Sequence, residues 1–358
     1  MHSRLEHYGW NDRFAAAFAE YAAPNRVPAR VTLEHTHIYR VVTEEGELLA
    51  RVSGRLRHRA EARADFPAVG DWVVLEPVAH SDARIHAVLP RVSRFSRRAA
   101  GDVTEEQVVA ANIDTVFLVG GLDRDFNPRR LERYLVVGWE SGATPVIVLN
   151  KADLVEDPQP FVAEVQAIAP GVDVFAVSTR QAPSLDVLRR FLGAGRTAAL
   201  LGSSGVGKSS IVNCLVGYDL LRTQDVRVTD QRGRHTSTSR QMVVLEDGGI
   251  LIDTPGMREL QLWETGETSL DAFADIHELA GSCRFRDCRH LQEPGCAVRA
   301  AVVSGELSQA RYDSFQKLAS EREHQERQMD VRAMLEQKRQ AKVMGKALHK
   351  RLKDKGVK

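Results

Sequence analysis

The alternation of apolar and polar positions marks a first region between residues 29 and 89. Five short segments there alternate in the way that half-buried strands do, and turn residues separate them. The segments span 29–33, 37–43, 47–52, 71–78 and 84–89. Five short strands in so short a stretch predict a small β-barrel of the OB kind, although the pattern alone also allows an SH3-like barrel.

From residue 113 the apolar positions form short continuous runs instead. The runs lie at 114–120, 145–149, 172–177, 197–201, 242–245 and 250–252. Most of them are separated by polar or amphipathic stretches of helical length. Continuous apolar runs are typical of parallel strands that are buried on both faces. We therefore predict a doubly wound α/β sheet whose ligand lies at the carboxyl ends of the strands.

The sequence after the run 197–201 matches the phosphate-binding pattern G-x-x-x-x-G-K-[ST] and lies between a predicted strand and a predicted helix. Glycines suit such a loop because backbone N–H groups must close around phosphate oxygens. We expect Lys208 to assist catalysis by reaching the β- and γ-phosphates, and the Ser209 hydroxyl to join a magnesium shell. The predicted nucleotide-binding residues of the loop are Gly202, Ser203, Ser204, Gly205, Val206, Gly207, Lys208, Ser209 and Ser210.

A second motif, Asn150-Lys151-Ala152-Asp153, follows the run 145–149 and matches N-K-x-D. The Asp153 carboxylate can accept from both the ring N–H and the exocyclic amine of guanine, whereas adenine presents no matching donor pair. Lys151 can lie along the base, and Asn150 can tie this loop to the phosphate loop. Ser178 follows the run 172–177, where a backbone contact to the guanine oxygen is expected. Alone the four residues could simply start a helix, but beside a phosphate loop they indicate GTP.

A third motif, Asp253-Thr254-Pro255-Gly256, has the D-x-x-G pattern and follows the run 250–252. Asp253 is expected to hold magnesium through water, and the Gly256 N–H to sense the γ-phosphate. The polar segment 218–240 precedes it and has few apolar residues to pack, so we expect it to be mobile without GTP. One threonine there, Thr236 or Thr238, is expected to close over magnesium.

The order of the motifs is reversed relative to an ordinary GTPase, in which the phosphate loop comes first. Here N-K-x-D precedes the phosphate loop by about fifty residues. The order predicts a circularly permuted domain, which the fold tolerates because chain ends in a compact domain are often close together. The segment after Asp253 to Gly256 then runs directly into the C-terminal part of the chain. We therefore expect nucleotide-dependent movement to reach that part.

Composition predicts a soluble protein, and the cysteine spacing predicts a metal site. The 358 residues exceed one ordinary domain, and 43% hydrophobic with 27% charged residues is typical of a soluble protein. No run is long enough to span a membrane, and the start MHSRLEHYGW lacks a signal-peptide core, so we expect a cytoplasmic protein. The chain has four cysteines. Three of them combine with a histidine in C-x4-C-x-H-x5-C, which predicts a closed tetrahedral zinc site of Cys283, Cys288, His290 and Cys296.

The net charge of +1 hides two basic regions. Residues 338–358 hold nine Lys or Arg against Asp354, and this stretch is either a solvated helix or an arm that binds phosphates. The second region, which lies between two strands of the predicted barrel, is either an ordinary loop or a nucleic-acid contact. Its members are Arg51, Arg55, Arg57, His58, Arg59 and Arg63.

The barrel, the permuted order of N-K-A-D, G-S-S-G-V-G-K-S and D-T-P-G, and the zinc motif together resemble the ribosome small-subunit-dependent GTPase family, RsgA, over almost the whole length. The resemblance implies an OB-fold, a permuted GTPase domain and a helical zinc domain. It also implies GTP hydrolysis stimulated by the small ribosomal subunit, contacts to ribosomal RNA and a role in late maturation of that subunit. Expected cofactors are one structural zinc ion and magnesium with GTP, and we expect a monomer that binds no membrane.

One catalytic position departs from the usual GTPase pattern. Many GTPases carry a glutamine after the D-x-x-G glycine to orient the attacking water, but here Met257 takes that place. A thioether cannot orient water in this way. His235, beside the switch threonines, is the candidate replacement because an imidazole can orient water or accept its proton. The alternative is that ribosomal RNA supplies the missing order.

These predictions divide the chain into five parts. The boundaries are an N-terminal extension at 1–28, an OB-fold barrel at 29–95, the GTPase domain at 96–265, the zinc-binding helical domain at 266–320 and a basic helical tail at 321–358. Two rival functions are a signalling or transport GTPase and an RNA-binding module with a vestigial nucleotide site. The missing apolar anchor disfavours the first, and the intact phosphate-loop residues disfavour the second.

Overall fold

The computed structural model describes most of the chain in two compact units, residues 1–272 and 273–358. The described residues are 3–35, 38–78, 82–98, 106–124, 126–203, 205–218, 240–253, 273–309, 311–313, 315–316 and 319. Within this part of the chain, none of the helices is both long and apolar enough to cross a bilayer.

Two short helices open the first unit, α1 (Arg4–His7) and α2 (Asp12–Ala19). The Asn11 side chain caps α2 by accepting from the backbone N–H groups of Arg13 and Phe14. Trp10 and Phe14 then pack their rings against Trp72 of the barrel, with centroids 4.7 and 5.7 Å from it. The N-terminal extension therefore covers one side of the barrel core.

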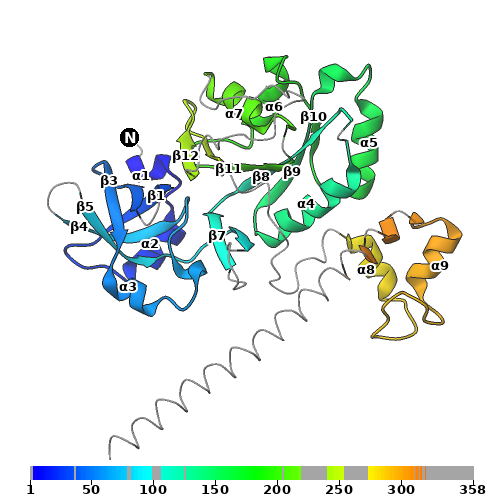
Figure 1. Ribbon diagram of the computed structural model, residues 1–358, viewed down its shortest axis with the longest axis horizontal. Helices are drawn as coiled ribbons and strands as arrows, with labels where there is room; N and C mark the ends of the chain where they lie inside the picture. The colour runs from blue at the N-terminus through cyan, green and yellow to red at the C-terminus, as the bar shows by residue number, and fades with distance from the viewer. Residues whose placement is uncertain are drawn as a thin grey trace, which may run out of the picture. The chain divides into compact units, whose positions relative to one another are not determined.

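The predicted barrel is present, and its five strands close on themselves (Figure 1, blue to cyan). The strands pair in the order β1-β2-β3-β5-β4, and β1 also pairs with β4. Closure leaves no free edge between the strands, and a helix follows β3, so the OB-like interpretation is confirmed. The elements are β1 (Val27–His35), β2 (Ile38–Val42), β3 (Glu47–Val52), α3 (Gly54–Arg59), η1 (Arg63–Asp65), β4 (Trp72–Val78) and β5 (Asp82–Val88).

A two-stranded hairpin, which the sequence analysis did not predict, lies between the barrel and the following sheet. It consists of β6 (Arg94–Arg98) and β7 (Glu106–Ala111), which pair antiparallel. Phe95 and Val109 of this hairpin belong to the same hydrophobic core as the next sheet.

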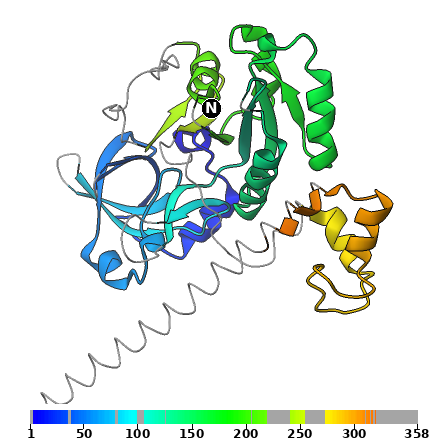
Figure 2. The same ribbon diagram turned by 45° about the vertical axis from the view of Figure 1, so that its right-hand side comes forward.

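The second region is the predicted doubly wound sheet (Figures 1 and 2). Strands β10, β9, β8, β11 and β13 lie side by side and are parallel. Successive residues of β8 face opposite layers: Val116 packs with α4 and α5, and Phe117 packs with α6 and α7. The elements are β8 (Thr115–Gly121), α4 (Pro128–Glu140), β9 (Thr144–Asn150), η2 (Ala152–Leu154), α5 (Gln159–Ile168), β10 (Val174–Ala176), η3 (Ala182–Leu185), α6 (Asp186–Arg189), β11 (Thr197–Gly202), α7 (Lys208–Val216), β12 (Arg240–Val244) and β13 (Ile250–Asp253).

One strand departs from the prediction of buried parallel strands. The run 242–245 contributes to β12, which pairs antiparallel with β13 and also with β1 of the barrel. The contact to the barrel joins Leu33 to Gln241 and Glu34 to Arg240. A single strand's apolar pattern does not encode the direction of its partners, so this arrangement was not predictable from that run. As a result, barrel and GTPase strands form one continuous sheet of 11 strands.

The second unit contains the helices α8 (Ala274–Ala280) and α9 (Ala297–Ser304), in agreement with the helical zinc domain that the family resemblance implies. The Arg311 guanidinium makes a two-pronged ion pair with the Asp275 carboxylate at 2.6 and 2.7 Å. Burial alone would raise the pKa of Asp275, but this guanidinium outweighs it and lowers that pKa. The tail predicted at 321–358 lies outside the described residues.

Candidate nucleotide-binding site and metal centre

The phosphate loop leaves β11 and enters α7, as the motif requires. Gly207 has a φ of +99°, and a Cβ there would lie 2.2 Å from Asn150 Nδ2. At Gly202 a Cβ would lie 2.5 Å from the carbonyl oxygen of Val119 on the neighbouring strand. Close approach therefore requires glycine at both positions, and the backbone conformation also requires it at Gly207. The first turn of α7 begins at Lys208, so its N-terminal N–H groups and dipole favour an anion.

The Lys208 side chain folds over this loop. Its Nζ donates to the carbonyl oxygens of Gly202 and Ser203, each at 2.6 Å. The ammonium is thus held at the phosphate loop by weak neutral acceptors. Phosphate oxygens are stronger acceptors for a cation, so a bound nucleotide can draw the ammonium away from these carbonyls.

The guanine motif and the phosphate loop are in direct contact. Asn150 ends β9, and its Nδ2 donates to the carbonyl oxygen of Val206 at 2.9 Å, which is the tie expected from the sequence. The side chain is buried, and its Oδ1 has no hydrogen-bond partner among the described residues. An unpartnered buried acceptor is costly, and its place between the two motifs marks a position built for a ligand.

Asp153 is held by residues of the loop after β10. The Ser178 hydroxyl donates to Asp153 Oδ1 at 2.6 Å, and Arg180 lies 3.4 Å from Oδ2. The Ser178 N–H donates to the Ser184 hydroxyl at 2.9 Å. The structure therefore brings Ser178 to the guanine motif, but through its side chain, which orients the carboxylate.

Asp123, which the sequence analysis missed, joins the same site. It follows β8, and its Oδ2 accepts from Lys151 Nζ at 2.6 Å. Lys151 has a φ of +65°, an uncommon conformation for a residue with a side chain. The ion pair fixes the lysine stem beside the base-recognition loop. The only signal in the sequence was an acidic residue two positions after a buried strand, and many loops share that feature.

Only the first residue of the D-x-x-G motif lies within the described residues. Asp253 ends β13, where its backbone pairs with Gln241, so the motif starts at the carboxyl end of a central strand. Five other expected site residues lie outside the described residues. They are Ser204 of the phosphate loop, His235, Thr236 and Thr238 of the segment 218–240, and Gly256 of the D-x-x-G motif.

The second unit contains the predicted cluster of three cysteines and one histidine. The four ligand atoms of Cys283, Cys288, His290 and Cys296 lie within 4.8 Å of one another. His290 Nδ1 is 3.6 Å from Cys283 Sγ and 3.4 Å from Cys296 Sγ. Ligands of one tetrahedral zinc ion at its usual bond lengths of about 2.0–2.3 Å lie roughly 3.5 Å apart. The donor set and its spacing therefore fit a structural zinc site.

Backbone groups at the start of α9 prepare this cluster for a cation. Desolvation alone would raise the pKa of Cys283, but the N–H groups of Val298 and Ala297 outweigh it and lower that pKa. Desolvation and the neighbouring thiols raise the pKa of Cys288 to about 11. Three thiolates so close together repel one another, and a bound zinc ion removes that repulsion.

Family models match most of the central and C-terminal sequence. A model described as "RsgA GTPase" matches residues 88–263. A second model, described as "50S ribosome-binding GTPase", matches residues 197–342.

Curated relatives and solved structures resemble nearly the whole chain. A protein of Opitutus terrae named "Small ribosomal subunit biogenesis GTPase RsgA" is 46% identical over 95% of this chain and 95% of its own length. A relative of the same name from Streptomyces coelicolor is 42% identical over 96% of this chain and 93% of its own. The structure of YjeQ from Thermotoga maritima has a TM-score of 0.63 and 27% identity, covering 83% of this chain and 98% of its own. The structure of YloQ, titled a circularly permuted GTPase, has a TM-score of 0.61 and 25% identity over 84% of this chain and 96% of its own.

Proposed function

The chain belongs to the RsgA GTPase family, and from this membership we propose that it binds the small ribosomal subunit, assists late maturation of that subunit and is stimulated by it to hydrolyse GTP. The products are GDP and phosphate. The protein acts as a monomer in the cytoplasm, and its contacts with the subunit include ribosomal RNA. The relatives that share its full length are named for this subunit.

The observation that carries the GTPase assignment is the contact of Asn150 with the phosphate loop at Val206. It joins the base-recognition and phosphate-binding motifs, which lie far apart in the sequence, into one site. The proposed nucleotide contacts follow from that geometry. The Asp153 carboxylate accepts hydrogen bonds from the ring N–H and the amine of guanine, and Lys151 lies along the base. Lys208 and the N–H groups of the phosphate loop neutralise the phosphates. Ser178 supports recognition of guanine by orienting the Asp153 carboxylate.

Metal ions have two separate roles in the proposal. Magnesium, bound together with GTP, neutralises phosphate charge, and the residues that would hold it are Ser209, Asp253 and one of Thr236 and Thr238. Zinc is structural and belongs to the cysteine cluster of the second unit, because four protein ligands leave no open position for water.

Orientation of the attacking water is assigned to His235, with ribosomal RNA as the competing source. The motif position after Gly256 is Met257, which cannot orient water. His235→Ala is expected to lower subunit-stimulated turnover by about a hundredfold if the imidazole acts as a general base. A variant that keeps the stimulated rate would leave that role to RNA.

The permuted order of the motifs is proposed to transmit the nucleotide state to the zinc-binding domain. The chain runs from Asp253 and Gly256 directly toward the second unit. Limited proteolysis should therefore cut the C-terminal part differently with GDP and with a non-hydrolysable GTP analogue. Identical digestion patterns would contradict this coupling. The five domain boundaries and the phosphate-binding role of the tail at 321–358 remain part of the same proposal.

The second model name, "50S ribosome-binding GTPase", suggests the large subunit as an alternative partner. That model covers only residues 197–342, whereas the Opitutus terrae and Streptomyces coelicolor relatives, which are named for the small subunit, align over 95% and 96% of the chain. Sedimentation through a sucrose gradient separates the two partners. With a GTP analogue the protein should comigrate with small subunits and not with large ones. Comigration with large subunits alone would refute the proposal.

A further inference from the structure

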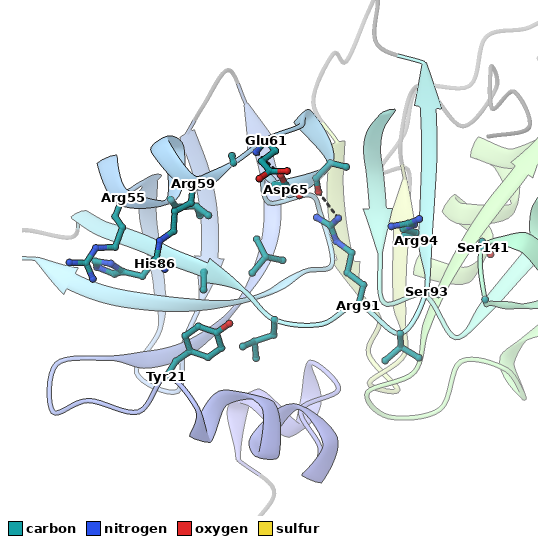
Figure 3. Close-up of a pocket in the computed structure, with 18 of the residues that line it drawn as sticks. Tyr21, Arg55, Arg59, Glu61, Asp65, His86, Arg91, Ser93, Arg94 and Ser141 are labelled. Atoms are coloured by element: carbon teal, nitrogen blue, oxygen red, sulfur yellow. Dashed lines mark hydrogen bonds between the residues drawn. The ribbon is translucent and has the colours of Figure 1, made fainter. Parts of the chain in front are cut away.

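A groove separates the barrel from the end of helix α4 (Figure 3). Its volume is about 910 Å³. Helix α3 and strand β5 form one side, the connection at 89–94 forms the floor, and residues 139–142 at the end of α4 form the other side. The groove is therefore built from both the barrel and the GTPase region, and it exists only because the two are packed together.

Two arginines of α3 are available in this groove. Arg55 and Arg59 are four residues apart, which places them on one face of the helix, and both are exposed. The described residues offer neither side chain a hydrogen bond or an ion pair. Figure 3 shows both side chains beside the groove. Two unneutralised cations on a rigid element form an anion-binding surface.

The other cations of the groove are neutralised or engaged within the protein. Arg91 is bound to Asp71, with its Nε and a terminal nitrogen 2.8 and 2.7 Å from the carboxylate oxygens. Arg94 lies 3.6 Å from Glu106. Asp65, an acid of the same groove, accepts from the backbone N–H of Glu61 at 2.8 Å. Glu61 and Glu140 also line the groove, so the cations left to attract an anion are the uncommitted guanidinium groups of α3.

Other residues of the groove supply a different kind of contact. Trp139 at the end of α4 and Tyr21 of the N-terminal extension are partly exposed and line the groove, and Ala87 and Val88 of β5 add apolar surface. Aromatic rings beside a cationic strip are the combination that binds unstacked bases and their phosphates. An acidic peptide would use the cations but has no need of the rings.

We propose that this groove holds a short single-stranded RNA segment, with Arg55 and Arg59 on successive phosphates and Trp139 against a base. The inference rests on the proposed function and deepens it, because it assigns a contact with subunit RNA to a composite surface of barrel and α4. Helix α4 connects the groove to the nucleotide site. The groove lies at the end of this helix, and the loop before the helix carries Asp123, which pairs with Lys151 of the guanine motif.

The chain offers a matched control for the test. Arg57 lies on α3 between the two groove arginines, and Arg63 follows in η1; both are exposed, and neither lines the groove. The double variant Arg55→Ala/Arg59→Ala and the control Arg57→Ala/Arg63→Ala therefore lose the same charge from the same region. Neither pair belongs to the nucleotide site, so basal GTP turnover and circular dichroism should stay at wild-type values in both.

The assay measures binding of a fluorescent twelve-nucleotide oligouridine by anisotropy at several salt concentrations. Loss of two phosphate contacts to single-stranded RNA should make the log–log salt slope shallower by about 1.4 in the groove variant. The control should change the slope by less than half as much. Trp139→Ala should weaken binding by about tenfold while leaving the slope unchanged, since stacking releases no counterions.

Equal slopes for the groove variant and the control would overturn the proposal, as would the absence of oligouridine binding by the wild-type chain. Competition by polyglutamate as effective as that by oligouridine would assign the groove to an acidic polypeptide and also overturn it. The same variants in the sucrose gradient separate this proposal from the proposed function. Wild-type protein that fails to comigrate with small subunits contradicts the function. A groove variant that comigrates with wild-type salt dependence contradicts only the groove.

Discussion

Arg30 is the residue through which the barrel, the N-terminal extension and the GTPase sheet meet. Its guanidinium is buried and donates to the carbonyl oxygens of Tyr8, Gly70 and Asn112 and to the Thr197 hydroxyl. Thr197 opens β11, the strand that leads into the phosphate loop. Burial lowers the pKa of Arg30 to about 10, while Asp114 and Asp71 oppose that shift, so the group stays charged at neutral pH.

Arg30→Met removes these donors while keeping an apolar stem of similar length. Gly70 still accepts from Asn112 Nδ2 at 3.1 Å, but the carbonyl oxygens of Tyr8 and Asn112 and the Thr197 hydroxyl lose the donor that Arg30 supplied. Each buried unpaired group costs about 1–3 kcal/mol, and relief of the buried charge offsets part of the sum, so we expect a net loss of about 3 kcal/mol. For a unit of this size that corresponds to a fall in Tm of roughly 5 °C.

Urea unfolding followed by tryptophan fluorescence measures the loss, because Trp72 lies beside Arg30. The transition should also become broader or split, since the barrel and the GTPase sheet lose a shared contact. Arg40→Met is the matched control: Arg40 is 48% exposed, with an ion pair of 4.0 Å to Glu47, and its loss should change stability by less than about 0.5 kcal/mol. Equal midpoints for the two variants would refute this account of Arg30.

Three further predictions concern the two sites. Asp153→Asn should weaken GTP binding by at least about a hundredfold and favour xanthosine triphosphate, because the amide donates where the carboxylate accepted; unchanged GTP affinity would argue against guanine recognition. Asp123→Ala should weaken binding of a fluorescent GDP analogue by roughly threefold, and in a double-mutant cycle it should add nothing to Lys151→Ala, because Asp123 acts through that lysine; additive losses would contradict this. Cys296→Ser, or treatment with a chelator, should release about one zinc ion per chain, measured by mass spectrometry, and make the second unit sensitive to protease while leaving GDP affinity unchanged; a resistant, zinc-free second unit would contradict the structural role.

Local chemistry explains why some features were predictable and others were not. The five barrel strands, the phosphate loop and the zinc cluster each depend on a pattern contained within one stretch of sequence. The pairing of β12 with β1 joins Gln241 to Leu33, and no local pattern encodes such a distant partner. The β6–β7 hairpin was missed because a strand such as Arg94–Arg98, with only one apolar residue, shows no apolar alternation.

The site residues also divide into those set by a local motif and those set by a distant partner. Asn150, Lys208 and Cys283 belong to motifs whose spacing carries the chemistry, so the sequence alone identifies them. Asp123 and Arg30 act through partners that are 28 and 167 positions away, namely Lys151 and Thr197. A buried arginine in a strand or an acid after a strand has many possible partners, and only the fold selects one. The backbone contact of Ser178 to the guanine oxygen stays a prediction, whereas the hydrogen bond from its hydroxyl to Asp153 is visible only in the fold.

The central claim is that this chain is a GTPase completed by the small ribosomal subunit, and turnover tests it most directly. GTP hydrolysis by the purified protein should be measured alone, with equimolar small subunits and with equimolar large subunits, at one fixed salt concentration. We predict slow turnover by the protein alone, strong stimulation by small subunits and none by large subunits. Equal turnover in all three reactions, with GTP still bound, would contradict the claim.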